Sequence, residues 1–280
     1  MQLQYHFAAV LILLSGITIN QVNARTPTTN VLSVSTEFSM GLEWSIHPRF
    51  TPTANFPINT PVINGYIRTG HKYQDSYVNP TGYGLTFKLS VFNHTKAIGE
   101  LNFRWQITGI AKEDGTPNNF YYPVITTKKT LYAGSSAAGA DTDPDALTIP
   151  LIPYRGTYHI KVEAISKNAS TGEKKIFKTL ERNFEVKDYL IVVMGDSFAS
   201  GVGNPDVKGD NATWLEPMAH RSFKGALSLI AAKLEADDPH SCVTFVNVAT
   251  SGAKTSHGLL FQQHPDWQIK GQIEEVKDYI

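Results

Sequence analysis

The sequence lacks several features that would assign it to common classes of protein. Cys242 is the only cysteine among 280 residues, so no disulfide can form within the chain and burial alone must hold the fold. The 25 basic and 25 acidic side chains cancel, which argues against a nucleic-acid partner, because such proteins normally carry a basic excess. Cys242 stands in an apolar run typical of a strand, which predicts a buried structural thiol.

Long apolar runs are scarce, and the one clear case lies at the N-terminus. Residues 7–19 are mostly apolar and small residues follow at positions 22–24, so we predict a signal peptide over residues 1–24 and a secreted protein. No other run is long enough to cross a bilayer, and no integral membrane segment is expected after signal removal. Export of this kind is compatible with N-glycosylation, for which the candidate residues are Asn93, Asn168 and Asn211.

Phosphate-binding loops are absent as well. A Walker loop needs a lysine after its second glycine, and none follows Gly201 or Gly203. A dinucleotide fingerprint needs a small residue where Asp206 stands, and that carboxylate would lie beside a pyrophosphate. The α/β-hydrolase elbow also fails, because Ala199 replaces its last glycine. We therefore expect no organic cofactor and no metal.

What the sequence does contain, over residues 27–187, is the alternation of apolar and polar residues that strands show. Expected strands cover residues 31–39, 85–92, 101–108, 147–152, 157–165 and 175–186. The clearest apolar faces are Phe103, Trp105 and Ile107 in one strand and Tyr158, Ile160, Val162 and Ala164 in another. Short strands separated by turn residues predict an all-β, immunoglobulin-like sandwich. Residues 50–83, rich in Pro, Asn and Tyr, are predicted to be a surface excursion, with a ligand-binding loop as the alternative.

After Asp188 the pattern changes. Residues 190–194 form a short apolar run, residues 223–234 carry a helical stripe with Ser222 as the expected N-cap, and residues 242–248 form a second apolar run. A strand, a helix and a strand in this order predict one crossover of a parallel sheet. Residues 268–280 begin another helical stretch. The predicted fold class is therefore the β-sandwich followed by an α/β domain with a parallel sheet over residues 188–280.

The turn after the first of these strands carries the chemistry. Gly195, Asp196 and Ser197 follow the apolar run at once. Open α/β sheets bind their ligands at the carboxyl ends of strands, so a serine here is a candidate nucleophile. An ordinary strand-to-loop turn is the alternative, because all three residue types are common in turns.

This turn resembles the first sequence block of the GDSL or SGNH hydrolases, a superfamily of secreted and periplasmic esterases and lipases. The likeness covers about 90 residues and follows the order of one branch, through residues 201–206, Trp214, residues 220–222 and residues 249–253. The second block of the superfamily is a glycine in a Ser-Gly context, which matches Ser251-Gly252. The resemblance implies an incomplete three-layer, flavodoxin-like domain of SGNH type.

The resemblance also implies roles for individual residues. Ser197 would attack a carboxylic ester, and the N–H groups of Ser197 and Gly252 would stabilise the oxyanion. Asp196 would brace the turn with Gly195, and His220 would have a structural role near the head of the following helix. Ser251 would support the second turn. The substrate classes that the family suggests are lipids and acetylated glycans.

The departures from the family are informative. Ala219 and Thr250 stand where related chains often have cysteines. The family's asparagine block and its Asp-x-x-His pair find no match, because Phe261 occupies the aspartate position before His264. We therefore expect an incomplete chain with little activity of its own. The alternatives are a non-catalytic secreted binding or adhesion module carrying a degenerate hydrolase remnant, and an enzyme that uses Cys242.

Overall fold

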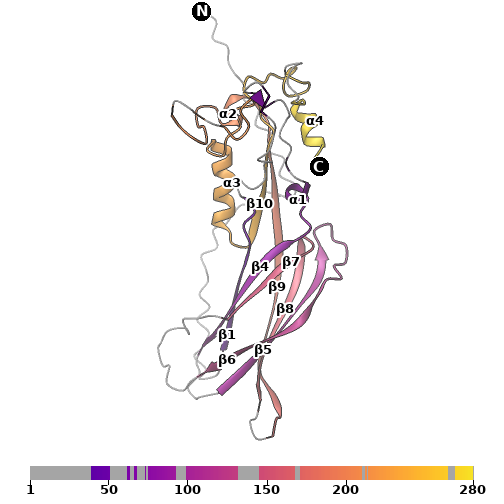
Figure 1. Cartoon of the computed structure of the whole chain (residues 1–280). Helices are drawn as coiled ribbons and strands as arrows, with labels where there is room; N and C mark the ends of the chain where they lie inside the picture. The colour runs from indigo at the N-terminus through magenta and orange to yellow at the C-terminus, as the bar shows by residue number, and fades with distance from the viewer. Residues whose placement is uncertain are drawn as a thin grey trace, which may run out of the picture. The chain divides into compact units, whose positions relative to one another are not determined.

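The computed structural model divides the chain into two compact units (Figure 1). It describes residues 39–50, 62–63, 66–67, 73, 75–92, 99–131, 145–167, 171–209, 212, 214–263 and 269–279. One unit contains residues 81–187 together with residues up to His47, and the other combines residues 48–80 with residues 188–280. The predicted signal peptide, the three glycosylation candidates Asn93, Asn168 and Asn211, and His264 lie outside the described residues.

The unit that contains residues 81–187 is built from antiparallel strands. In one sheet the order is β1 (Ser39–Ile46), β4 (Tyr83–Phe92) and β7 (Asp145–Ile152). The other has the order β9, β8, β5, β6, formed by β5 (Gly99–Lys112), β6 (Tyr121–Leu131), β8 (Gly156–Lys167) and the first part of β9 (Lys174–Val193). The strand β6 was not predicted, because its sequence, with adjacent threonines and lysines, does not alternate regularly between apolar and polar residues.

Aromatic side chains join the two sheets of this unit. The ring of Phe184 on β9 lies 5.1 Å from that of Trp44 on β1 and 5.3 Å from that of Phe87 on β4, measured between centroids. Such tilted and edge-to-face pairs are favourable beyond the area they bury. The predicted apolar faces of the two clearest strands are confirmed, since Phe103, Trp105, Ile107, Tyr158, Ile160, Val162 and Ala164 are all buried.

The predicted fold class, an immunoglobulin-like sandwich followed by a three-layer α/β domain with a parallel sheet, is wrong. The described residues are about 49% strand and 14% helix, and their sheets are antiparallel or mixed. The reason lies in β9, which was predicted as two strands, residues 175–186 and 190–194. No glycine or proline interrupts it, so the last antiparallel strand runs on through Asp188 and pairs with β10 (Ser241–Asn247) at its end.

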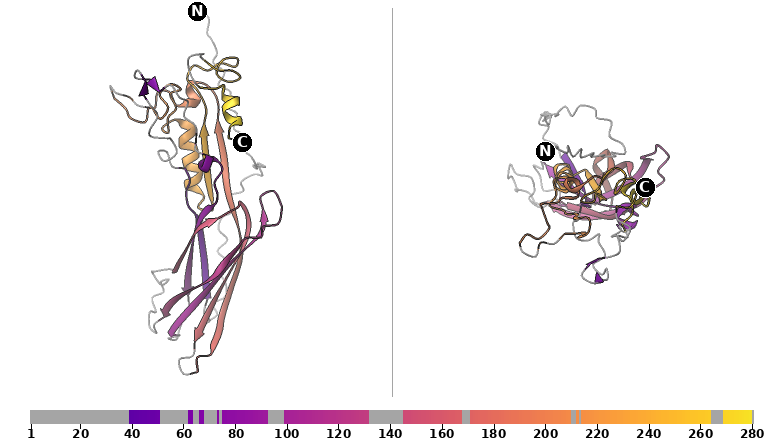
Figure 2. Two further views of the ribbon diagram at one scale, coloured as in Figure 1. Left: turned by 45° about the vertical axis from the view of Figure 1, so that its right-hand side comes forward. Right: turned by 90° about the horizontal axis from the view of Figure 1, so that it is seen from above.

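In the other unit, the end of β9 and β10 are covered on both faces. Figure 2 shows α3 (Ala226–Asp237) and α4 (Gln272–Lys277) on opposite sides of the two strands. Ile191 and Val193 point towards α3, whereas Val192 and Met194 pack with Val276 of α4. The unit also contains β2 (Val62–Ile63), β3 (Tyr66–Ile67), α1 (Asp75–Val78) and α2 (Ser197–Ser200). No helix among the described residues is long and apolar enough to cross a membrane.

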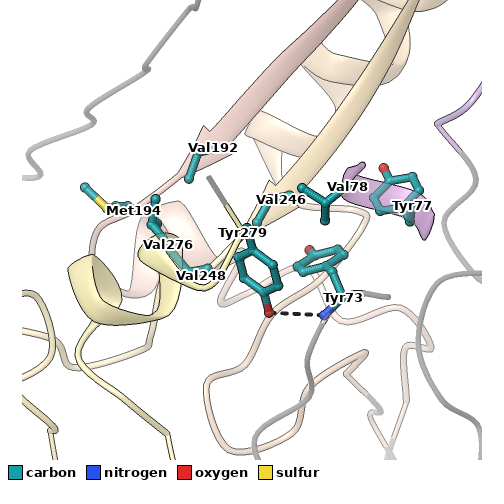
Figure 3. Close-up of a cluster of buried hydrophobic side chains, with 9 residues drawn as sticks. All are labelled: Tyr73, Tyr77, Val78, Val192, Met194, Val246, Val248, Val276 and Tyr279. Carbon is teal, nitrogen blue, oxygen red and sulfur yellow. Dashed lines mark hydrogen bonds between the residues drawn. The ribbon is translucent and has the colours of Figure 1, made fainter. Parts of the chain in front are cut away.

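The prediction of a surface excursion over residues 50–83 is wrong for its second half. Tyr73 and Tyr77 are buried and pack against β10 (Figure 3). The Tyr77 hydroxyl accepts from Phe245 N at 2.9 Å and donates to Phe245 O at 3.2 Å, and the Tyr73 hydroxyl accepts from Asn247 N at 2.8 Å. Burial is the largest cause that raises the pKa of Tyr77, to about 12. The tyrosines thus satisfy backbone groups along the outer edge of β10.

Two local predictions had different outcomes. The predicted burial of Cys242 is confirmed: its side chain is fully buried, and this burial together with the nearby Asp188 raises its pKa, which disfavours the thiolate that an enzyme based on this thiol would need. The predicted N-cap, Ser222, is wrong, because α3 begins later, at Ala226, with Gly225 as its N-cap. The Ser222 hydroxyl instead donates to the Asn204 carbonyl and to Asp206.

Candidate functional site

The candidate site lies where β9 and β10 end, and backbone hydrogen bonds hold the two ends together. Val248 N donates to Val193 O at 2.9 Å, and Thr250 N donates to Gly195 O at 3.2 Å. Ser197 and Gly252 each lie two residues beyond the second of these bonds. The pairing therefore places the two turns that the sequence singled out at the same edge of the sheet.

The first turn holds Ser197 at the start of the short helix α2. Gly195 has φ 145°, a conformation that side chains rarely adopt, and Asp196 is the N-cap, whose carboxylate accepts from Phe198 N at 3.1 Å. This is the hydrogen bond that a bracing role for Asp196 requires. Ser197 is half-buried, and neither its hydroxyl nor its N–H makes a hydrogen bond to another described residue. Both groups are thus available to a ligand.

The second turn places Gly252 in a left-handed conformation with φ 80°. A Cβ at this position would lie 3.0 Å from Gln263 Nε2, which itself donates to Ser251 O at 2.9 Å. Ser251 N donates to Ala219 O at 2.9 Å, so both backbone groups of Ser251 are used. The N–H of Gly252, by contrast, has no acceptor within the described part of the chain. The left-handed conformation therefore favours glycine, and Gly252 is exposed.

His220 lies beside the second turn but does not contact the serine. Its φ of 53° is the single left-handed value of a non-glycine residue in the described ranges, its ring lies 4.9 Å from that of Trp214, and its Nδ1 is buried without a partner there. No described histidine hydrogen-bonds the Ser197 hydroxyl. The structure thus brings together Gly195, Asp196, Ser197, Ser251 and Gly252, with His220 at the side and no base on the serine.

Sequence reasoning missed the charged residues that support this edge. Asp206 accepts from Leu215 N at 2.7 Å and from Phe223 N at 2.9 Å, which fixes the loop between α2 and α3. In the sequence, Asp206 counted against nucleotide binding and belonged to the stretch that resembles the GDSL hydrolases, but neither observation predicted these partners. Nothing in the residues around Asp206 indicates these partners, which lie 9 and 17 positions away.

Arg221 is the second missed residue, and it is almost completely buried. Its guanidinium donates to Glu275 at 3.0 and 2.9 Å, to Ala249 O at 2.9 Å and to Val248 O at 3.0 Å. Burial would lower the pKa of Arg221, but the charge of Glu275 and its hydrogen bonds outweigh this and raise it above the ordinary value. A permanently charged arginine with four hydrogen bonds therefore holds the end of β10.

The described residues contain no group of three or more His, Cys, Asp or Glu side chains that could hold a metal ion. This edge offers the Ser197 hydroxyl and the N–H groups of Ser197 and Gly252, none of which bonds to another described residue. No family model matches the chain, and no curated protein matches it.

Proposed function

We propose that this protein is a serine hydrolase of carboxylic esters, with Ser197 as the nucleophile and the N–H groups of Ser197 and Gly252 as the oxyanion donors. The observation that carries the proposal is the pair of unbonded amides together with an unbonded hydroxyl, all within two residues of the hydrogen bond from Thr250 to Gly195. Ser197 is half-buried and Gly252 is exposed, so a ligand can reach the three groups, and donors placed beside a nucleophile are what acyl transfer requires. The resemblance to the GDSL hydrolases supports the same roles.

The proposed reaction is acyl transfer. Ser197 Oγ adds to the ester carbonyl carbon as its proton leaves to a base, and the carbonyl oxygen becomes an oxyanion held by the two N–H groups. Collapse of the intermediate breaks the bond to the alcohol, which takes up the proton, and water then hydrolyses the acyl-serine. The base is not among the hydrogen-bond partners of Ser197 in the described ranges. We propose a secreted protein acting on lipid esters or acetylated glycans.

The proposal is tested by covalent labelling. We expect a fluorophosphonate probe to modify the whole protein once, with the added mass on the peptide that contains Ser197, because this reagent reacts with activated serines. The Ser197→Ala variant should not be labelled, and Ser76→Ala, which changes an exposed serine of α1, should be labelled like the wild type. Equal labelling of both variants, or none in the wild type, would contradict an activated Ser197.

A second candidate function, glycan binding, is favoured by a hollow in the unit of antiparallel strands. This hollow has a volume of about 350 Å³ and is lined by Lys112, Pro117, Asn119, Phe120, Tyr121, Pro153 and Tyr154. Tyr121 is 55% and Tyr154 43% exposed, although aromatic rings are usually well covered. Sugar rings have apolar C–H faces, which match the exposed tyrosine rings. They also have hydroxyl edges, which match the amide of Asn119 and the ammonium group of Lys112.

The ring of Tyr154 is held in place, as such a platform requires. The Tyr158 hydroxyl donates to Tyr154 O at 2.6 Å, and Lys112 Nζ lies 4.5 Å from the centroid of the Tyr154 ring. Phe120 packs edge to face on Tyr158 with 5.9 Å between ring centroids. A preformed surface loses little conformational entropy when it binds.

Binding to soluble polysaccharides by calorimetry tests this second function. We expect the double variant Tyr121→Ala/Tyr154→Ala to lose about tenfold or more in affinity, since aromatic stacking contributes on the order of 1–3 kcal/mol per ring. The control is Ile176→Ala, which removes an equally exposed apolar side chain from β9 outside the hollow. Unchanged affinity in the double variant would overturn the assignment, as would binding of proline-rich peptides in place of sugars.

A further inference from the structure

The helix α4 carries two polar side chains on its buried face. Gln272 is completely buried and Glu275 is 6% exposed, and they lie three residues apart, so they project from the same side of the helix. Burial of an amide or a carboxylate is costly unless each is fully hydrogen-bonded. Both side chains reach groups at the ends of β9 and β10. Apolar packing of α4 against these strands would not by itself require such contacts.

Gln272 pairs with both backbone groups of Gly195. Gly195 N donates to Gln272 Oε1 at 2.7 Å, and Gln272 Nε2 donates to Gly195 O at 2.8 Å. The side-chain amide thus pairs with the backbone of Gly195, just beyond the end of β9, as the backbone of a neighbouring strand would. Gly195 O also accepts from Thr250 N, so the residue two positions before Ser197 is fixed from two directions.

Glu275 acts on the other strand through Arg221. Its two carboxylate oxygens accept from the guanidinium, and the guanidinium donates to the carbonyls of Val248 and Ala249. The start of α4 also joins the loop that follows Gly252, because Gln272 N donates to Gly258 O at 2.8 Å. The strand end that leads to Gly252 and the loop that follows it are therefore both tied to α4.

We infer that α4 positions the two halves of the site, with Gln272 as the positioning residue for Ser197 and Glu275, through Arg221, as the positioning residue for Gly252. This inference rests on the proposed function. Attack on an ester requires the hydroxyl and both amides to keep their separations, and a shift of about 1 Å far from the reacting atoms can cost a hundredfold in rate. One rigid helix contacting both strand ends fixes these separations.

The test is steady-state hydrolysis of p-nitrophenyl butyrate by the whole protein. We expect Gln272→Met, which keeps the size of the side chain but none of its hydrogen bonds, to lower kcat by about a hundredfold with little change in KM. The matched control is Glu274→Gln on the same helix, whose side chain is 63% exposed and whose kcat should not change. Circular dichroism confirms that each variant is folded.

A second variant keeps the inference testable if Gln272→Met does not fold. Gln272→Glu retains an acceptor for Gly195 N, and its protonated form also offers a donor to Gly195 O. We therefore expect its kcat, relative to wild type at each pH, to recover as the pH is lowered, whereas a purely structural role gives no such recovery. A folded Gln272→Met with wild-type kcat overturns the positioning role if Ser197→Ala is inactive. An active Ser197→Ala overturns the proposed function itself.

Discussion

Replacement of Ser197 by alanine is expected to reduce ester hydrolysis to the background rate. Loss of the nucleophile from a serine hydrolase lowers kcat by on the order of a million-fold, because the covalent route is removed while binding and the oxyanion donors remain. The measurement is turnover of p-nitrophenyl butyrate by purified wild-type and Ser197→Ala protein. A rate within tenfold of the wild type would exclude this serine from the mechanism.

The same variant should leave stability unchanged. The Ser197 hydroxyl makes no hydrogen bond to another described residue, so its removal leaves no donor or acceptor unpaired there. We therefore expect the midpoint of thermal unfolding to match that of the wild type. This separates a chemical effect from misfolding, because an inactive variant with an unchanged midpoint has lost chemistry alone.

Replacement of Arg221 by methionine is expected to have the largest effect on stability. The change leaves the buried carboxylate of Glu275 without its cation, removes the donor to the Ala249 carbonyl, and leaves the Val248 carbonyl with only the Thr250 hydroxyl, at 3.4 Å. Breaking a buried pair from one side costs about 3–5 kcal/mol, because a charge stays buried and uncompensated. Urea unfolding monitored by tryptophan fluorescence measures the loss as a lower midpoint.

Two comparisons make this second result interpretable. Lys233→Met removes one partner of an exposed pair with Asp237, and exposed pairs contribute less than about 1 kcal/mol. The double variant Arg221→Met/Glu275→Met should regain part of the stability, since no unpaired charge remains. A loss below about 1 kcal/mol in Arg221→Met alone would show that the buried pair does not hold the end of β10.

The sequence by itself determined the local parts of this protein. The alternation along β5 and β8 identified the side chains that are buried, because a strand turns successive residues to opposite faces whatever lies beyond it. Local signals also marked the turns of Ser197 and Gly252. Glycines at positive φ and a capping aspartate are properties of a few consecutive residues, so they can be recognised without the fold.

Only the tertiary structure decided how these parts combine. The absence of glycine and proline around Asp188 permits one strand to continue through it, but only the pairing with β8 and β10 shows that it does, and the predicted parallel-sheet domain failed there. Tyr77 bonds to Phe245 across 168 positions, and Gln272 bonds to Gly195 across 77. The roles of Gln272, Glu275 and Arg221 were not predicted, because a polar side chain shows its role only when burial removes water and leaves distant backbone groups as its partners.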